Sequence, residues 1–212
     1  MKTKPFMQFS CIILLCLLFV MKVFSQSVGY FTDPRDGRKY KYVQIGEQTW
    51  MAENLKYETK TGCICYNNEL VKCAIYGRLY EWGVAKKSCP TGWHLPSKDD
   101  FDKLFDYLGG ASVAGGKLKE SGNIHWDRPN REATNSSGFT ALPGGNYSMG
   151  EFFSLGEYAL FITTTFEQPI IDPEYTEIWT AKCDKYLGEA GYGVMRIYSG
   201  DKASIRCIKN SK

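Results

Sequence analysis

The 212-residue chain has few of the features on which membrane and metal-dependent proteins rely. It contains two histidines, His94 and His125, and no Cys-x-x-Cys pair, so a metal site has little support. Its longest apolar run has 11 residues, which excludes a polytopic membrane protein because a spanning helix needs about 20. The Gly-x-Ser-x-Gly nucleophile elbow is also missing, so a serine triad has no local signature.

The residues that are abundant indicate a domain rich in loops. Aromatic residues make up 15% of the chain, and it holds 21 glycines and 8 cysteines. Charged residues make up 23%, which is an ordinary globular share. This composition excludes collagen and coiled coils, and it favours an extracellular domain over a helix bundle.

Residues 1–25 have the order of features that marks a secretory signal peptide. Lys2 and Lys4 form a basic start, the apolar run covers 11–21, and Val23 and Ser25 precede the expected cleavage site. We therefore expect a signal peptide over 1–25 and a single mature domain over 26–212, with an uncleaved anchor as the alternative. The apolar run ends at Lys22, so we expect no membrane span after cleavage.

The mature chain is expected to be electrically neutral. Removing the three lysines of the signal peptide leaves 23 basic residues, which equals the 23 acidic ones. Binding of a polyanion depends on an excess of basic side chains. We therefore do not expect nucleic acid as a partner.

Six cysteines remain after signal cleavage, and they are Cys63, Cys65, Cys73, Cys89, Cys183 and Cys207. An even number of cysteines in an exported chain predicts disulfides. The spacing does not choose the pairs, except that Cys63 and Cys65 are too close in sequence to pair without strain. A bond between Cys89 and Cys207 would close most of the domain.

Two helices are predicted from the apolar spacing. Ser97 is a good N-cap, and apolar residues at 101, 104, 105 and 108 predict a helix over 98–108 that Gly109 ends. Leu79, Trp82 and Ala85 predict a second helix over 78–87.

Residues that favour extended backbone predict a hairpin over 39–52 and four further strands. These strands are expected over 158–165, 177–181, 193–198 and 203–208. The ranges 56–76 and 123–150 lack periodicity and are predicted to be long loops. The fold class is therefore α+β, with two helices and a sheet of short, mostly antiparallel strands.

Seven motifs occur in order along residues 33–208. They are Asp33-Pro34-Arg35-Asp36-Gly37, Val43-Gln44-Ile45-Gly46-Glu47-Gln48-Thr49-Trp50-Met51-Ala52-Glu53-Asn54-Leu55, Cys65-Tyr66-Asn67-Asn68, Tyr76-Gly77-Arg78-Leu79-Tyr80-Glu81-Trp82, Cys89-Pro90-Thr91-Gly92-Trp93-His94-Leu95-Pro96-Ser97, Ser137-Gly138-Phe139-Thr140-Ala141-Leu142-Pro143-Gly144-Gly145 and Ser204-Ile205-Arg206-Cys207. Together they resemble the Fibrobacter succinogenes major paralogous domain family of surface or secreted bacterial proteins. One departure is the segment 161–165, where the family usually has a Trp-Ser-Ser-Thr-like strand.

The resemblance implies a disulfide pattern. Cys65 with Cys73 and Cys89 with Cys207 are the expected family pairs. Cys63 and Cys183 look additional to the family pattern, and we expect them to pair with each other.

The region from Trp82 to the helix after Leu95 is also similar to the helix region of C-type-lectin-like domains. In those domains a cysteine near the first helix joins one in the last strand. The likeness implies a C-type-lectin-like fold that is cross-linked by disulfides.

Aromatic residues of the loop region are the best candidates for ligand contacts. Trp126, Tyr147 and Trp179 lie in polar contexts, and Asp127 and Arg128 follow Trp126 directly. Flat rings bury the apolar faces of sugars at low entropic cost, while charged side chains bind the hydroxyls. We expect these five residues to bind ligand, with rings that fill loop cores as the alternative.

Other polar residues have structural interpretations. Asp99 and Asp100 suit a helix N-terminus, and His94 is expected to pack in the core because its neighbours are apolar. The spacing marks no acid as a partner for His125. The sequence has no EF-hand loop and none of the Glu-Pro-Asn or Gln-Pro-Asp signatures of lectin calcium sites. We therefore expect no catalytic residue and no cofactor, with a structural calcium ion as the alternative.

These observations predict an exported, non-catalytic binding or adhesion module. We expect it to be secreted or in the cell envelope, in the periplasm or on the outer surface, with carbohydrate or a cell-surface protein as its partner. The alternatives are an enzyme on the same fold and a structural or assembly component of the envelope.

Overall fold

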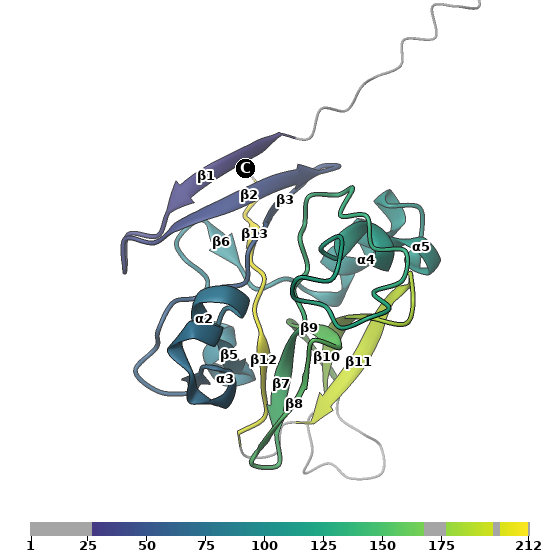
Figure 1. Cartoon of the computed structure of the whole chain (residues 1–212). Coiled ribbons are helices and arrows are strands. Elements are labelled where there is room, and N and C mark those ends of the chain that lie inside the picture. Colours follow the sequence, from purple (N-terminus) through teal and green to yellow (C-terminus); the bar gives the residue numbers. More distant parts are fainter. Residues whose placement is uncertain (1–26, 168–176, 197–199, 212) are drawn as a thin grey trace, which may run out of the picture.

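The computed structural model describes residues 27–167, 177–196 and 200–211, and Figure 1 shows their arrangement. The expected signal peptide lies outside the described residues. The strands are β1 (Val28–Thr32), β2 (Lys39–Ile45), β3 (Gln48–Met51), β4 (Cys63–Ile64), β5 (Leu79–Glu81), β6 (Trp93–His94), β7 (Gly144–Ser148), β8 (Glu151–Leu155), β9 (Tyr158–Glu167), β10 (Glu177–Asp184), β11 (Ala190–Arg196), β12 (Lys202–Ser204) and β13 (Ile208–Lys209). The helices are η2 (Tyr66–Asn68), α2 (Leu70–Tyr76), α3 (Trp82–Ala85), α4 (Lys98–Tyr107) and α5 (Ala111–Leu118). The expected mixture of helices with mostly antiparallel strands is confirmed.

The smaller sheet contains the hairpin that the sequence predicts over 39–52. Its strand order is β1-β2-β3-β13-β6, and all of its pairings are antiparallel. The hairpin turns at Gly46, whose φ of 60° lies in the left-handed region that glycine adopts without strain. Val43 pairs with Trp50, which puts both side chains on the buried face of the sheet.

The larger sheet has the order β11-β10-β9-β12-β5-β4, and the β7-β8 hairpin joins it through β12. Of the pairings described, only that between β9 and β12 is parallel. Figure 1 shows α4 and α5 beside the β9–β11 end of this sheet, and α2 and α3 beside the β5 end. The sheet therefore lies between two helical regions.

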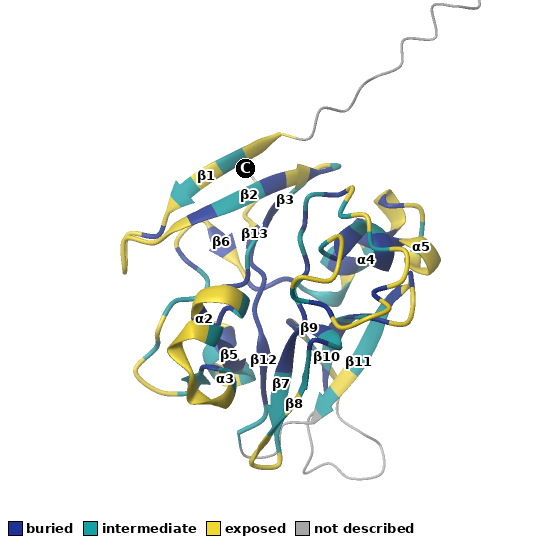
Figure 2. Ribbon diagram, viewed as in Figure 1, coloured by how far each residue is buried: buried dark blue, intermediate teal, exposed yellow. Residues whose placement is uncertain are grey.

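The core beside α4 follows from the apolar spacing of that helix. Ser97 caps it, because its side chain accepts a hydrogen bond from the backbone N–H of Asp100 at 3.2 Å. Phe101 packs at 4.9 Å from Trp50, which belongs to the smaller sheet, and at 6.2 Å from Phe161 of β9. One buried cluster thus connects both sheets, as the dark ribbon segments of Figure 2 indicate.

The structure differs from the predicted helices in two ways. The range 78–87 holds a strand followed by a short helix, because β5 pairs with β12 and β4 on its two sides. In addition, α2 and α5 lie where no helix was predicted. The pattern of α2 is not amphipathic, since Leu70 and Val71 are exposed, and α5 contains Gly115, where a Cβ would lie 1.9 Å from the carbonyl oxygen of Glu189.

Two of the three expected disulfides are present. Cys65–Cys73 has a Cα–Cα distance of 5.0 Å, and Cys89–Cys207 links residues 118 apart with a Cα–Cα distance of 5.9 Å. Both distances are ordinary for a disulfide.

The predicted bond between Cys63 and Cys183 is wrong, because both are free thiols. Cys63 lies on β4 and Cys183 on β10, and β5, β12 and β9 separate these strands. Four strand spacings amount to about 19 Å, which is too far for a disulfide.

Two buried cations fasten the loop region to the rest of the protein. Arg206 binds the side chain of Asn54 and the carbonyls of Met51, Phe139 and Thr140, so its N–H groups are satisfied without a carboxylate. Burial lowers the pKa of Arg206 to about 9, which still leaves it protonated at neutral pH.

Lys119 is the second buried cation. Its ammonium donates to the carbonyls of Arg131, Asp184 and Leu187 at 2.7–2.8 Å. These carbonyls come from the loop after Trp126, from the last residue of β10 and from the turn that follows it, so one side chain connects these segments.

No helix in the described part of the chain is long and apolar enough to cross a membrane.

Candidate functional site

The loop that follows α5 is anchored by Trp126. This side chain is 2% exposed, and its indole N–H donates to the carbonyl of Ala141 at 3.0 Å. The prediction that the Trp126 ring contacts a ligand is therefore corrected: the ring fills the core of the loop. A buried tryptophan needs a partner for its N–H, and the carbonyl of Ala141 provides it.

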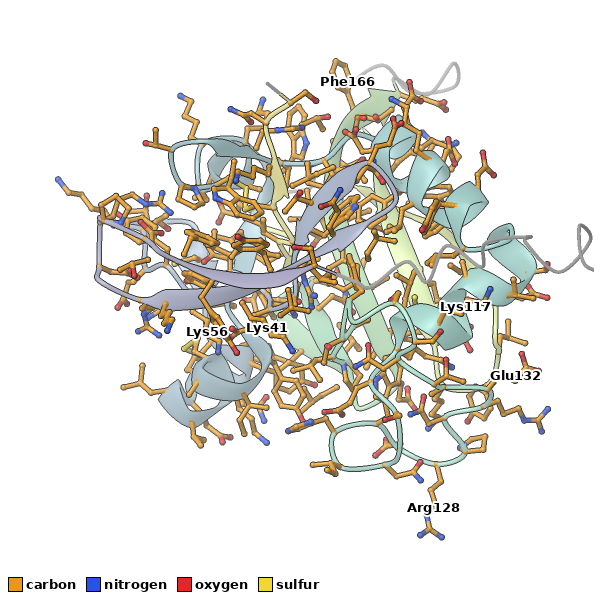
Figure 3. The ribbon with its side chains drawn as sticks, turned by 90° about the horizontal axis from the view of Figure 1, so that it is seen from above. Lys41, Lys56, Lys117, Arg128, Glu132 and Phe166 are labelled. Carbon is orange, nitrogen blue, oxygen red and sulfur yellow. A yellow bond between two sulfur atoms is a disulfide. The ribbon has the colours of Figure 1, made fainter. Side chains whose placement is uncertain are left out.

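Asp127 and Arg128, two of the predicted ligand-binding residues, are exposed next to this anchor. The backbone N–H of Asp127 donates to the carbonyl of Gly156 at 2.8 Å, which holds the loop against the β8–β9 turn. Figure 3 shows Arg128 projecting away from the body of the protein. Of the two side chains, only that of Asp127 has a recorded charged partner, the ammonium of Lys185 at 3.8 Å.

His125 lies one residue before the anchor and is paired with an acid. Its Nδ1 is 2.9 Å from both carboxylate oxygens of Glu120. Tyr76, at the end of α2, places its ring edge-on to the imidazole with centroids 5.6 Å apart. The sequence did not identify Glu120 as the partner of His125, because no local pattern predicts that a loop brings side chains five residues apart into contact.

Two carboxylates of this polar group act on Tyr76. Desolvation raises the pKa of Tyr76, and the carboxylates of Glu120 and Asp127 raise it further. Asn130, a 7% exposed residue of the same loop, donates from Nδ2 to the carbonyls of Glu120 and Gly122. The two acids thus share a surface with a tyrosine and a histidine.

Tyr147, another predicted site residue, belongs to a row of half-buried rings. It packs edge-on against Phe152 with centroids 4.9 Å apart, and the Phe152 ring lies 5.0 Å from that of Tyr66 in η2, just before α2. The ammonium of Lys202 lies 4.8 Å from the Tyr147 ring and forms an ion pair with Glu81 at 3.0 Å. The row therefore joins the β7-β8 hairpin to the segment before α2.

Gly144 connects the aromatic row to the polar group. A Cβ added at Gly144 would lie 3.6 Å from the Cβ of Tyr76, so the start of β7 and the end of α2 are in contact. Tyr147 is the third residue after Gly144, a distance of about 10 Å along an extended strand.

We call this surface the α2–β7 face. It has an aromatic end (Tyr66, Tyr147 and Phe152) and a polar end (Tyr76, Glu120, His125 and Asp127). Figure 1 locates α2 and the β7-β8 hairpin, which contribute Tyr76, Tyr147 and Phe152 to this face.

Trp179 does not belong to this face. It lies on β10, where its ring packs edge-on against Tyr192 with centroids 5.7 Å apart. The neighbouring Ile178 pairs with Phe166, and Figure 3 shows Phe166 on the opposite side of the protein from Arg128. The predicted site residues are thus divided: Asp127 and Tyr147 share the α2–β7 face, while Trp179 lies on another surface.

The described residues contain no group of three or more His, Cys, Asp or Glu side chains that could hold a metal ion. The expected core position of His94 is wrong, because its side chain is exposed. Its Nδ1 is 2.7 Å from Oδ1 of Asn210, and its Nε2 is 4.0 Å from a carboxylate oxygen of Asp100. Neither histidine therefore belongs to such a group in the described chain.

Residues 43–209 match the family described as Fibrobacter succinogenes major domain. The match contains every residue of the α2–β7 face. No curated protein and no solved structure matches the chain.

Proposed function

The chain belongs to the Fibrobacter succinogenes major domain family, and we propose that it is an exported, non-catalytic module that binds carbohydrate through the α2–β7 face. The observation that carries this proposal is the continuity of the face. Half-buried rings at one end and hydrogen-bonding side chains at the other lie on adjoining elements.

The chemistry of the two ends suits a sugar chain. Tyr66, Tyr147 and Phe152 offer flat apolar surface that needs little ordering on binding. Glu120, His125 and Asp127 offer polar groups of the kind that fix the orientation of a ligand. The two ends extend over about 10 Å along β7, so an oligosaccharide suits the face better than a single sugar.

The export and fold parts of the proposal rest on the cross-links and on the sequence. Two disulfides suit an oxidising compartment, in agreement with the signal-like segment at 1–25. Cys89–Cys207 joins a cysteine near the first helices to the last strands, as expected for a C-type-lectin-like fold. The same features support secretion or residence in the cell envelope.

A hydrolase is the second candidate, and one observation favours it. Glu120 holds Nδ1 of His125, and a carboxylate in that position orients an imidazole so that its other nitrogen can accept a proton. A structural or assembly role in the envelope would need neither end of the face to bind a glycan.

The test is a glycan array probed with the oxidised chain 26–212. The Tyr147→Ala variant should lose the signal, because it removes a central ring of the aromatic end. The matched control is Trp179→Ala, which removes a half-buried ring on another surface and should keep the signal. Loss of binding in Trp179→Ala with full binding in Tyr147→Ala would overturn the assignment of the face, and an empty array would favour the assembly role.

Incubation of the bound glycan with the protein separates module from enzyme. A binding module leaves the mass of the glycan unchanged. A shortened glycan, together with loss of cleavage in the His125→Asn variant, would support a hydrolase and contradict the non-catalytic module.

A further inference from the structure

The strand β1 is an open edge of the smaller sheet. It pairs with β2 on one side, and no other strand in the described part of the chain pairs with it. Figure 1 shows β1 at the margin of the molecule, with no helix or strand beyond it. An open edge presents backbone N–H and C=O groups that another extended chain can pair in a ladder.

The register shows which residues of β1 have these free backbone groups. Antiparallel neighbours alternate between pairs that exchange both hydrogen bonds and pairs that exchange none. The N–H of Gln44 donates to the carbonyl of Ser27 at 2.9 Å. The N–H of Asp33 donates to the carbonyl of Arg38 at 2.8 Å. Both pairs continue the β1–β2 register, so the odd-numbered residues bond to β2 and the even-numbered ones point their backbone groups to the open edge.

The even-numbered residues of β1 are Val28, Tyr30 and Thr32, and all three are exposed. Their free groups are self-complementary about Tyr30. When a second copy of β1 is laid antiparallel with Tyr30 opposite Tyr30, Val28 lies opposite Thr32, and free groups meet free groups at every pair. This register forms about six hydrogen bonds, two for each pair. A register shifted by one residue would set free groups against groups that already bond to β2.

The side chains of β1 also suit pairing with a second copy. The strand contains no charged residue and no proline, and its pairing with β2 is uninterrupted over five residues. Proteins use charges, prolines and bulges to keep open edges apart. In the register centred at Tyr30, two tyrosine rings and two Val28–Thr32 pairs become neighbours, and aromatic and β-branched pairs stabilise sheets.

Two other edge strands lack these properties. The strand β6, at the other edge of the same sheet, has only two residues. The strand β8 contains Glu151 and is distorted at Ser154, whose φ of 61° lies in the left-handed region. An undistorted and uncharged edge therefore distinguishes β1 from both.

We infer that two copies of this chain associate through β1, whose strands pair antiparallel about a two-fold axis at Tyr30 and join the two smaller sheets into one. A self-complementary patch is what a two-fold interface requires. The inference is independent of carbohydrate binding. A pair of five-residue strands is smaller than a standard interface, so the dimer is weak, with a Kd of about 10–100 μM.

Sedimentation velocity of the oxidised chain 26–212 tests the inference. The chain should be monomeric at about 1 μM and mostly dimeric at about 500 μM, as expected for a small interface. A chain that stays monomeric over this range overturns the inference.

Two substitutions of Tyr30 separate the backbone from the ring. Tyr30→Pro removes the central free N–H, which β2 does not use, and should weaken the dimer about thirtyfold because two hydrogen bonds are lost. The matched control Tyr30→Thr keeps that N–H and should stay within about fivefold of the unaltered chain. Circular dichroism checks that both variants are folded. A dimer that Tyr30→Pro leaves unchanged overturns the inference.

Amide hydrogen exchange followed by NMR tests the register in the unaltered chain. The amides of Gly29 and Phe31 should be protected at all concentrations, because they bond to β2. Those of Tyr30 and Thr32 should exchange rapidly in the dilute monomer and become protected as the dimer forms. A dimer in which the Tyr30 and Thr32 amides stay unprotected overturns the inference.

Discussion

Replacing Cys89 and Cys207 by alanine should destabilise the protein about twice as much as replacing Cys65 and Cys73. In the chain-entropy model, a disulfide stabilises by restricting the unfolded chain, and the effect grows with loop length. The separation of 118 residues gives about 4.9 kcal/mol for Cys89–Cys207, and the separation of 8 gives about 2.5 kcal/mol for Cys65–Cys73.

The assay is thermal unfolding followed by circular dichroism in non-reducing buffer, with the free thiols alkylated. For a chain of this size, 1 kcal/mol lowers Tm by about 2–4 °C. The first double variant should therefore lose about 10–20 °C and the second about 5–10 °C. Cys65, Cys73 and Cys207 are buried and Cys89 is half-buried, so truncation removes packed side chains in both variants and that part of the loss cancels in part. An equal loss, or a larger loss for Cys65–Cys73, would refute the loop-length reasoning.

Three further predictions concern buried side chains. Lys119→Met should lower the free energy of unfolding in urea by about 3–5 kcal/mol, because it removes three hydrogen bonds from a charged ammonium to partly buried carbonyls. The control Lys117→Met removes one such bond and should cost about 1 kcal/mol, so similar losses would contradict this account. Trp126→Ala should lower the free energy of unfolding by about 3–5 kcal/mol, because the ring is buried. Trp126→Phe should keep glycan binding. Loss of binding in a folded Trp126→Phe variant would show that the Trp126 ring belongs to the binding site. Alkylation of the native protein at about pH 8 should label Cys63 but not Cys183, because burial raises the pKa of Cys183 to about 12, and rapid labelling of both would contradict the burial.

The parts of the fold that could be predicted are those with a strong local pattern. The spacing of Phe101, Leu104 and Phe105 behind Ser97 predicts α4 because an amphipathic helix needs little help from distant residues. The hairpin of β2 and β3 was also predictable, since the turn at Gly46 separates two β-favouring runs.

The parts that could not be predicted depend on distant partners. Leu79 and Trp82 have helical spacing, but β12 pairs with Leu79 from a position 125 residues later in the chain. Gly115 and Gly116 weaken the helical pattern of α5, yet the close approach of backbone carbonyls from Glu189 and Glu132 leaves no room for a side chain. Tertiary contacts override local propensity at both places.

The candidate site was predicted in part for a related reason. The polar, loop-like composition predicts Asp127 and Tyr147 as ligand-binding residues, and both lie on the α2–β7 face. Composition does not distinguish a buried tryptophan such as Trp126 from an exposed one. The burial of Trp126 depends on contacts with distant residues, such as the carbonyl of Ala141 that accepts from its indole. The pair of His125 with Glu120 was missed since it arises from the path of the loop.

Chemical-shift mapping with the strongest glycan from the array tests the central claim most directly. The isotope-labelled, oxidised chain 26–212 is titrated with that glycan, and the amide shifts are followed by residue. The account predicts that the largest changes cluster around Tyr66, Tyr147, Phe152 and Asp127. Changes that cluster instead around Trp179 and Tyr192 would contradict it.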